Sequence, residues 1–290
     1  MILNLVDPEK SHIKYKISKF PDGQQTIDII DFTKSKFIDG TISIWSRLNN
    51  FKDLELIICA NQAMKNIGAT HVHLFTPYFV GARSDRQFQE GGVNYLKQVI
   101  CPIINNQNFS SVTVIDPHSD VLEACLNNFV KINNFDLVSN TLLNLVRSDS
   151  DEVVLVSPDA GAYKKVFDVA KQFNIDKIIT ATKVRDLKTG NIIRTEVPVL
   201  DQHNKLMYII VDDICDGGRT FLELAKAIKD SRPTATVYLI VTHGIFSAGF
   251  DQLVQQIDGI FTTNSVKDIE PGIDCPLIGN DSYVKQLNVF

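Results

Sequence analysis

LMYIIVDDICDGGRT, residues 206–220, determines more about the fold than any other stretch of this chain. Its first half is a continuous apolar run, which predicts a strand buried on both faces. The run ends in two adjacent carboxylates, Asp212 and Asp213, and an amphipathic helical pattern, FLELAKAIKD, follows the loop. The loop between strand and helix consists of Asp216, Gly217, Gly218, Arg219 and Thr220.

This loop has the composition of an anion site. Small residues let backbone N–H groups converge on an anion, and a following helix adds its positive end. Paired acids before such a loop can hold sugar hydroxyls or hydrated Mg²⁺. The pattern predicts a site for a phosphorylated sugar, with an ordinary turn of solvated acids as the alternative. A Walker A loop is excluded because no Gly-Lys-Ser/Thr follows, and an EF-hand because the acids lack its alternating spacing.

Composition restricts the class of protein. The 290 residues suffice for two domains, and 44% hydrophobic with 22% charged residues is typical of a soluble globular protein. No apolar run approaches a membrane span of about 20 residues. The five scattered cysteines favour a reduced, cytoplasmic protein. A net charge of −5 argues against nucleic acid, so a phosphate ester would need local cations, backbone amides and Mg²⁺.

Apolar, β-branched runs alternate with helical patterns along the chain. The predicted strands are 72–77, 111–116, 152–158, 176–182, 205–213 and 235–243, and the predicted helices include 60–69, 91–104, 162–173 and 220–230. Such alternation predicts an α/β fold with parallel sheets covered on both faces. Functional residues of these sheets gather at the carboxyl ends of the strands.

Two blocks of these units predict two α/β domains, with a break near residues 131–140. The asparagine-rich patches at 49–50, 104–108 and 127–134 are expected to be loops.

Polar clusters follow several strands. Asp116 and His118 stand two residues apart, so in an extended segment they would point to one side and suit Mg²⁺ and a polyphosphate. A strand-end turn with a hydrogen-bonded histidine is the alternative. Arginines at 83–86 suit phosphate oxygens or a purine, and equally a solvated turn. Lys183 and Arg185 can neutralise a transferring phosphoryl group, or belong to an exposed hairpin.

Together and in collinear order, these segments resemble the ribose-phosphate pyrophosphokinases, also called phosphoribosyl diphosphate (PRPP) synthetases. The matching segments are FPDGQ (20–24), PYFVGARSDR (77–86), DPHS (116–119), SPDAG (157–161), TKVRD (182–186), VDDICDGGRT (211–220) and THGIFSAG (242–249). The resemblance implies two phosphoribosyltransferase-like domains, each a mainly parallel sheet flanked by helices. Residues 1–136 would form the ATP side and 137–290 the ribose 5-phosphate side, with the option that the last residues pack back on the N-terminal domain.

The same resemblance implies an enzyme that transfers the β,γ-diphosphoryl group of Mg-ATP to the C1 hydroxyl of ribose 5-phosphate, giving PRPP and AMP. Its implied catalytic residues are Lys183, Arg185 and His118. The implied ATP-binding residues are Phe20, Asp22, Gln24, Arg83, Ser84, Asp85 and His118. The implied ribose-5-phosphate residues are Asp212, Asp213, Asp216, Gly217, Gly218, Arg219 and Thr220, and the implied metal ligands Asp116, His118 and Asp159.

Several positions depart from the family pattern. Where this chain has Gln24 and Ser84, the family more often has Glu and Gln. Where this chain has Arg219, a small residue is usual in the family. That arginine either adds a phosphate contact or points to solvent. The segment 87–99, near family subunit contacts, also matches poorly. These departures indicate a divergent branch.

Two other functions remain open on the sequence. One is a catalytically silent, regulatory relative, and the other is a phosphoribosyltransferase that uses PRPP. The expected partners are ATP, ribose 5-phosphate and further copies of the chain in a dimer or higher homo-oligomer, without nucleic acid or membrane.

Overall fold

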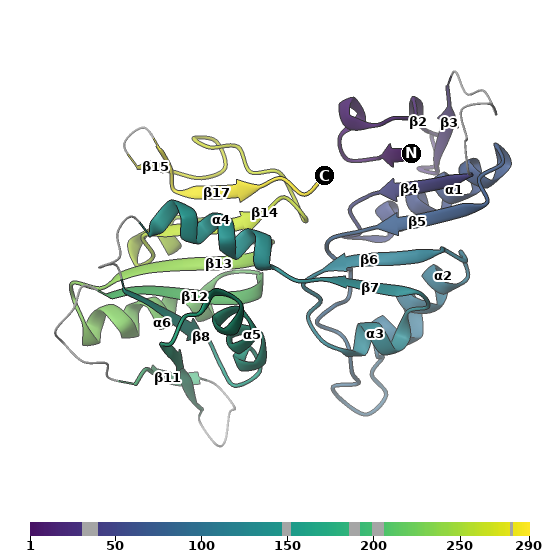
Figure 1. Ribbon diagram of the computed structural model, residues 1–290. Helices are drawn as coiled ribbons and strands as arrows, with labels where there is room; N and C mark the ends of the chain where they lie inside the picture. Colours follow the sequence, from purple (N-terminus) through teal and green to yellow (C-terminus); the bar gives the residue numbers. More distant parts are fainter. Residues whose placement is uncertain (31–39, 147–151, 186–191, 199–205, 279–280) are drawn as a thin grey trace. The chain divides into compact units, whose positions relative to one another are not determined.

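The computed structural model describes residues 1–30, 40–146, 152–185, 192–198, 206–278 and 281–290 (Figure 1). The chain divides into two compact units. Unit 1 comprises Met1–Asn133 with Val289–Phe290, and unit 2 comprises Asn134–Asn288. The sequence places the boundary after residue 136. No helix among the described residues is long and apolar enough to cross a membrane.

Unit 1 is built on a five-stranded sheet in which all the paired strands are parallel, in the order β1-β4-β5-β6-β7. The strands are β1 Ile2–Asn4, β4 Thr41–Trp45, β5 His71–Phe75, β6 Ser111–Ile115 and β7 Phe129–Ile132. An antiparallel hairpin, β2 Tyr15–Lys19 and β3 Gln25–Ile29, precedes β4. The helices are α1 Phe51–Asn66, α2 Cys101–Asn105 after a π-helical turn at Leu96–Ile100, and α3 Val121–Cys125.

Burial alternates along the strands of unit 1. Ile42 and Ile44 of β4 are fully buried in the core that also contains Leu54 and Ile57 of α1. Their neighbours Ser43 and Trp45 are only partly buried. One face of β4 therefore carries the core, and the other carries polar and aromatic side chains.

Unit 2 contains a six-stranded, fully parallel sheet in the order β17-β14-β13-β12-β8-β9. Its strands are β8 Glu152–Ser157, β9 Ile178–Thr180, β12 Leu206–Cys215, β13 Thr236–Gly244, β14 Gly259–Thr263 and β17 Val284–Leu287. Two short antiparallel pairs form separate two-stranded sheets: β10 Thr182–Arg185 with β11 Ile192–Glu196, and β15 Leu277–Ile278 with β16 Asp281–Ser282. These parallel sheets confirm the predicted fold class.

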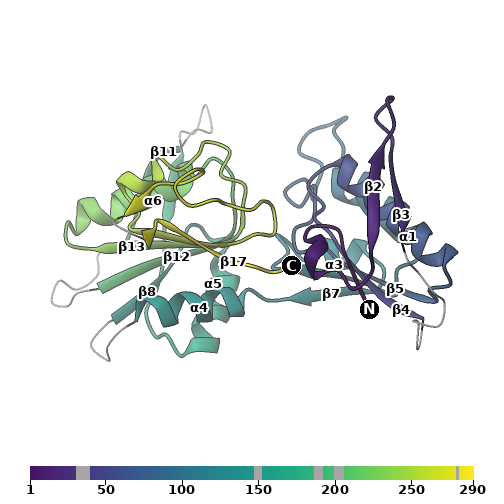
Figure 2. The ribbon, with the colours of Figure 1, turned by 90° about the horizontal axis from the view of Figure 1, so that it is seen from above.

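Helices cover both faces of the unit 2 sheet. Figure 2 shows α6 Arg219–Ser231 on one side and α4 Phe135–Leu145 with α5 Tyr163–Phe173 on the other. Residues of β12 alternate between the two cores: Ile210 packs with the α6 side and Val211 with the α5 side. The apolar run of β12 is continuous because both faces are buried.

The predicted helices at 162–173 and 220–230 are confirmed, whereas two others begin elsewhere. α1 begins at Phe51 because the Asn50 side chain accepts hydrogen bonds from two backbone amides of the first turn, a cap that the prediction overlooked. The prediction of a loop at 127–134 is wrong, because this segment contains β7. There the strand preference of Phe129, Val130 and Ile132 prevails over the flanking asparagines.

Candidate functional site

The candidate sugar site lies at the carboxyl end of β12, between the neighbouring strands β8 and β13. Asp212 is partly exposed there and Asp213 is 4% exposed. The backbone N–H of Asp213 donates a 2.9 Å hydrogen bond to Oδ1 of Asp212. The two acids are thus adjacent but differ in their access to solvent.

A lysine that the sequence-based assignment missed holds the more buried acid. Nζ of Lys165, in the first turn of α5, lies 2.6 Å from Oδ2 of Asp213. The available sequence signal was the lysine pair at 164–165, which begins three residues after the SPDAG segment in the first turn of the following helix.

The local field at Asp212 is negative. Burial, reinforced by the neighbouring Asp213 carboxylate, raises the pKa of Asp212 well above the usual carboxyl range. Lys165 opposes the shift, and Asp159 adds to it. Asp159 follows β8, and its Oδ1 accepts hydrogen bonds from the N–H groups of Gly161 and Ala162. The carboxylates at this edge therefore favour a bound cation or hydrogen-bond donors.

The loop after β12 has the geometry of an anion cradle. Gly218 has φ +78°, and a Cβ there would lie 2.9 Å from Leu253 Cδ2, so glycine is required on both grounds. Among the described residues, none accepts a hydrogen bond from the N–H groups of Gly217, Gly218, Arg219 or Thr220. These amides stand at the start of a 13-residue helix, where an anion is stabilised.

A second loop fixes the cradle. Ser247 Oγ donates a 2.6 Å hydrogen bond to Oδ1 of Asp216, and the Ser247 N–H donates to the Asp216 carbonyl at 3.1 Å. Ile245 and Phe246 donate their N–H groups to the carbonyl of Cys215. The segment after β13 therefore orders the loop after β12, a role that the sequence-based assignment missed.

The residues on either side of the loop, Cys215 at the end of β12 and Arg219 at the start of α6, differ in exposure to solvent. The Arg219 side chain is 84% exposed, and its Nε lies 2.7 Å from Oε1 of Glu223 one turn along α6, so it points to solvent along the helix. Cys215 is fully buried, and burial, followed by the charges of Asp212 and Asp216, raises the pKa of its thiol to about 12.

The residues expected at ATP lie in unit 1. Phe20, Asp22 and Gln24 are exposed at the tip of the β2–β3 hairpin, where Gly23 adopts φ +99°. The turn is closed by hydrogen bonds from the Phe20 N–H to the Gln24 carbonyl and from the Gln24 N–H to Asp22 Oδ1. The FPDGQ segment is thus a hairpin turn that presents its side chains to solvent.

The arginine-rich segment follows β5. Arg83 is exposed, whereas Ser84 and Asp85 are partly buried. The Asp85 carbonyl accepts a 2.7 Å hydrogen bond from Asn94 Nδ2. Gly81 adopts φ +79°, and a Cβ there would meet the Tyr95 ring at 2.6 Å. The segment is therefore anchored on both sides of the predicted ATP-site residues.

Asp116 and His118 follow β6, the neighbour of β5. Asp116 is 4% exposed and adopts φ +43°, while His118 is exposed. The predicted extended segment is wrong at this position, because the backbone at Asp116 is left-handed. Such strain in a non-glycine residue often accompanies function.

Lys183 and Arg185 lie in β10, whose backbone pairs with β11 and carries an irregularity between Val184 and Arg185. Their side chains lie outside the described part of the chain. The structure thus gathers the predicted sugar-site residues with Asp159 on unit 2 and the ATP-site residues with Asp116 and His118 on unit 1.

Among the described residues, no group of three or more His, Cys, Asp or Glu side chains is arranged to hold a metal ion. Mg²⁺ commonly uses only one or two carboxylates, completed by water and substrate phosphates. The negative field at Asp212 fits such a cation.

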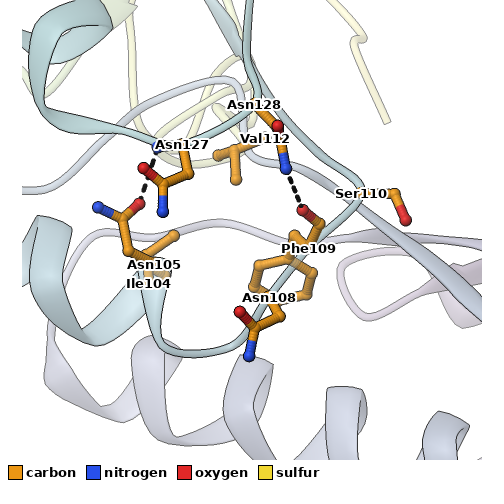
Figure 3. Close-up of a pocket in the computed structure, with 8 residues that line it drawn as sticks. All are labelled: Ile104, Asn105, Asn108, Phe109, Ser110, Val112, Asn127 and Asn128. Carbon is orange, nitrogen blue, oxygen red and sulfur yellow. Dashed lines mark hydrogen bonds between the residues drawn. The ribbon is translucent and has the colours of Figure 1, made fainter.

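One pocket lies away from these sites, at the amino ends of β6 and β7 (Figure 3). Its volume is about 260 Å³, and it is lined by Ile104, Asn105, Asn108, Phe109, Ser110, Val112, Asn127 and Asn128. Figure 3 shows Asn105 accepting a hydrogen bond from the Asn127 N–H and Asn128 donating to the Phe109 carbonyl. These amides join neighbouring loops, which is a structural role.

Comparisons with known proteins give a consistent result, although no family model matches the chain. A ribose-phosphate pyrophosphokinase from Marinomonas sp. (strain MWYL1) is 26% identical over 270 residues, covering 90% of this chain and 81% of that protein. Another from Mycoplasmopsis pulmonis is 27% identical over 257 residues, covering 87% and 76%.

The fold is similar to that of a solved structure. The crystal structure of phosphoribosylpyrophosphate synthetase from Mycobacterium smegmatis superposes with a TM-score of 0.76 at 15% identity, covering 97% of this chain and 88% of that one. Because the sequence alignments extend over about nine-tenths of the chain, they include both units. The chain is therefore similar over both units to ribose-phosphate pyrophosphokinases, at 26–27% identity to these two relatives.

Proposed function

We propose that this chain is a ribose-phosphate diphosphokinase that transfers the diphosphoryl group of Mg-ATP to ribose 5-phosphate, giving PRPP and AMP. The observation that carries the proposal is the end of β12, where two acids are followed, after three intervening residues, by an amide cradle at the start of α6. The first group suits sugar hydroxyls and the second a phosphate. Relatives that match both units bear the name of this activity.

The reaction forms one bond and breaks one. The C1 hydroxyl oxygen bonds to the β-phosphorus of ATP, the bond from that phosphorus to the oxygen shared with the α-phosphate breaks, and AMP leaves with that oxygen. The hydroxyl proton is released. Because such transfers require little covalent chemistry from the protein, positioning and charge stabilisation supply most of the acceleration.

Unit 2 binds the acceptor in this proposal. The amides of Gly217 to Thr220 bind the 5-phosphate, and Asp216, ordered by Ser247, keeps the loop in place. Asp212 accepts hydrogen bonds from the ribose hydroxyls. Lys183 and Arg185 neutralise the negative charge that builds on the diphosphoryl group.

Unit 1 binds the donor. Phe20, Asp22 and Gln24 contact the adenine, and Arg83, Ser84 and Asp85 complete the nucleotide site. Asp116 and His118 lie at the ATP phosphates. Asp116, His118 or Asp159 would hold Mg²⁺ together with the substrate phosphates, and the ion would supply neutralisation of phosphate charge.

The direct test is to incubate the purified protein with Mg-ATP and ribose 5-phosphate and to follow AMP and PRPP by ³¹P NMR and chromatography. Stoichiometric AMP and PRPP are expected. A phosphoribosyltransferase would form neither from these substrates, and a silent regulatory relative would bind them without turnover. Absence of AMP at every Mg²⁺ and phosphate concentration tested contradicts the proposal.

A further inference from the structure

Lys165 and Asp213 form a largely buried ion pair at the edge of the sheet that carries the sugar site. Nζ of Lys165 and Oδ2 of Asp213 are 2.6 Å apart, and the two side chains are 24% and 6% exposed. A carboxylate this buried is costly unless a cation compensates it. The ion pair therefore explains how β12 can carry a second acid directly after Asp212.

The pleat of β12 separates the two acids. Successive side chains of a strand point to opposite faces, and Val211 packs in the core on the α5 side while Ile210 packs on the α6 side. Asp213 follows Val211 on the α5 side, where Lys165 contacts it. Asp212 is partly exposed, whereas the Asp213 side chain is 6% exposed.

The ion pair is also linked to Asp212 through the backbone. The N–H of Asp213 donates to Oδ1 of Asp212 at 2.9 Å. Because Lys165 holds Asp213 in place, it also orients the Asp212 carboxylate through this hydrogen bond. An unpaired Asp213 would add a second negative charge next to Asp212 and would move this backbone.

We propose that Lys165 is a positioning residue of the sugar site, which anchors and neutralises Asp213 so that Asp212 alone accepts the sugar hydroxyls. The inference rests on the proposed function, because it assigns different tasks to two acids of the same site. Lys165 itself acts through Asp213 and makes no contact with substrate in this assignment.

Four variants test it: Lys165→Met, which keeps the aliphatic stem, Lys165→Arg, which keeps the charge, Asp212→Asn, and the double variant Lys165→Met/Asp213→Asn. The dissociation constant of ribose 5-phosphate is measured by calorimetry with Mg²⁺, beside that of a non-hydrolysable ATP analogue. Lys171→Met, at the exposed far end of α5, is the matched control.

Lys165→Met is expected to weaken ribose 5-phosphate binding by about tenfold or more, as is common for residues that orient a binding group. The affinity of Lys165→Met for the ATP analogue should stay unchanged. The Lys171→Met control should bind ribose 5-phosphate as the wild type does. Lys165→Arg and the double variant should recover most of the affinity, since neither leaves an unpaired buried charge. Asp212→Asn should bind ribose 5-phosphate more weakly than the wild type, although Lys165 is intact.

Wild-type affinity in Lys165→Met overturns the inference. So does a double variant as weak as Lys165→Met, because the lysine would then act on the ligand directly. If Lys165→Met does not fold, Lys165→Arg and the double variant still give the comparison with Asp212→Asn. Wild-type protein that makes no AMP and binds no ribose 5-phosphate refutes the proposed function as well, whereas normal wild-type activity with an unaffected Lys165→Met refutes only the role of Lys165.

Discussion

Ser247 Oγ donates a 2.6 Å hydrogen bond to Oδ1 of Asp216, which joins the loop after β13 to the loop after β12. A second hydrogen bond, from the Ser247 N–H to the Asp216 carbonyl, holds the same two residues through their backbones. Two loops that are distant in sequence thereby form one binding surface.

Ser247→Ala is expected to weaken ribose 5-phosphate binding severalfold, because the Asp216 carboxylate loses its anchor while the backbone contact remains. The free energy of unfolding should fall by about 1 kcal/mol or less, the usual contribution of one exposed hydrogen bond. Calorimetry and urea unfolding measure both quantities, with Ser231→Ala on α6 as the control. Unchanged ribose 5-phosphate affinity in Ser247→Ala would show that Ser247 does not contribute to binding at the sugar site.

Gly218→Ala should lower the free energy of unfolding by about 1–2 kcal/mol, the cost of a left-handed conformation in a residue with a Cβ. The added Cβ would also lie 2.9 Å from Leu253 Cδ2. Gly217→Ala is the matched control, because its Cβ would lie 3.7 Å from Ser247 Oγ, an ordinary contact. Equal losses in the two variants would contradict the assignment of strain to Gly218.

Asp212→Asn should change how stability depends on pH. The pKa of Asp212 is raised in the folded protein, so the folded state binds its proton more tightly than the unfolded chain. This contribution is fully present below the unfolded pKa of about 4 and is lost as pH rises through the folded pKa. In metal-free buffer, the variant should therefore gain stability relative to wild type as pH rises.

Urea unfolding at several pH values measures this difference, with Asp168→Asn on the exposed face of α5 as the control. A difference between Asp212→Asn and wild type that stays constant with pH would rule out a raised pKa at Asp212.

Arg219→Ala is expected to change the free energy of unfolding by less than about 0.5 kcal/mol, because its pair with Glu223 is at the surface. Ribose 5-phosphate binding should stay within about twofold of wild type. A tenfold loss of affinity, seen by calorimetry, would mean that the arginine leaves Glu223 and reaches the phosphate.

Lys183→Ala is expected to lower kcat by about 10²-fold or more, while the KM for ribose 5-phosphate changes little. The reason is that a cation which neutralises developing charge acts mainly in the transition state. Steady-state kinetics with Lys171→Ala as the control measure both constants. A change confined to KM would assign Lys183 to ground-state binding instead.

Local patterns were sufficient for much of the sugar site. The apolar run of β12, its terminal acids and the Gly-Gly turn before α6 all depend on residues that are neighbours in sequence, so periodicity and turn chemistry reveal them. The strand β7 was missed because asparagines flank it and its pairing with β6 is a tertiary contact.

By itself, the sequence determined the alternation of strands and helices, the acids and the glycines at the end of β12, because each follows from short-range spacing. Only the tertiary structure decided that Lys165 reaches Asp213 and that Ser247 anchors Asp216. Those partners are 48 and 31 residues apart in the chain. Parallel strands bring their carboxyl ends to one edge, but which side chains then meet depends on the packing of α5 and the loop after β13. The difference between Asp212 and Asp213 therefore appears only once the sheet and its helices are assembled.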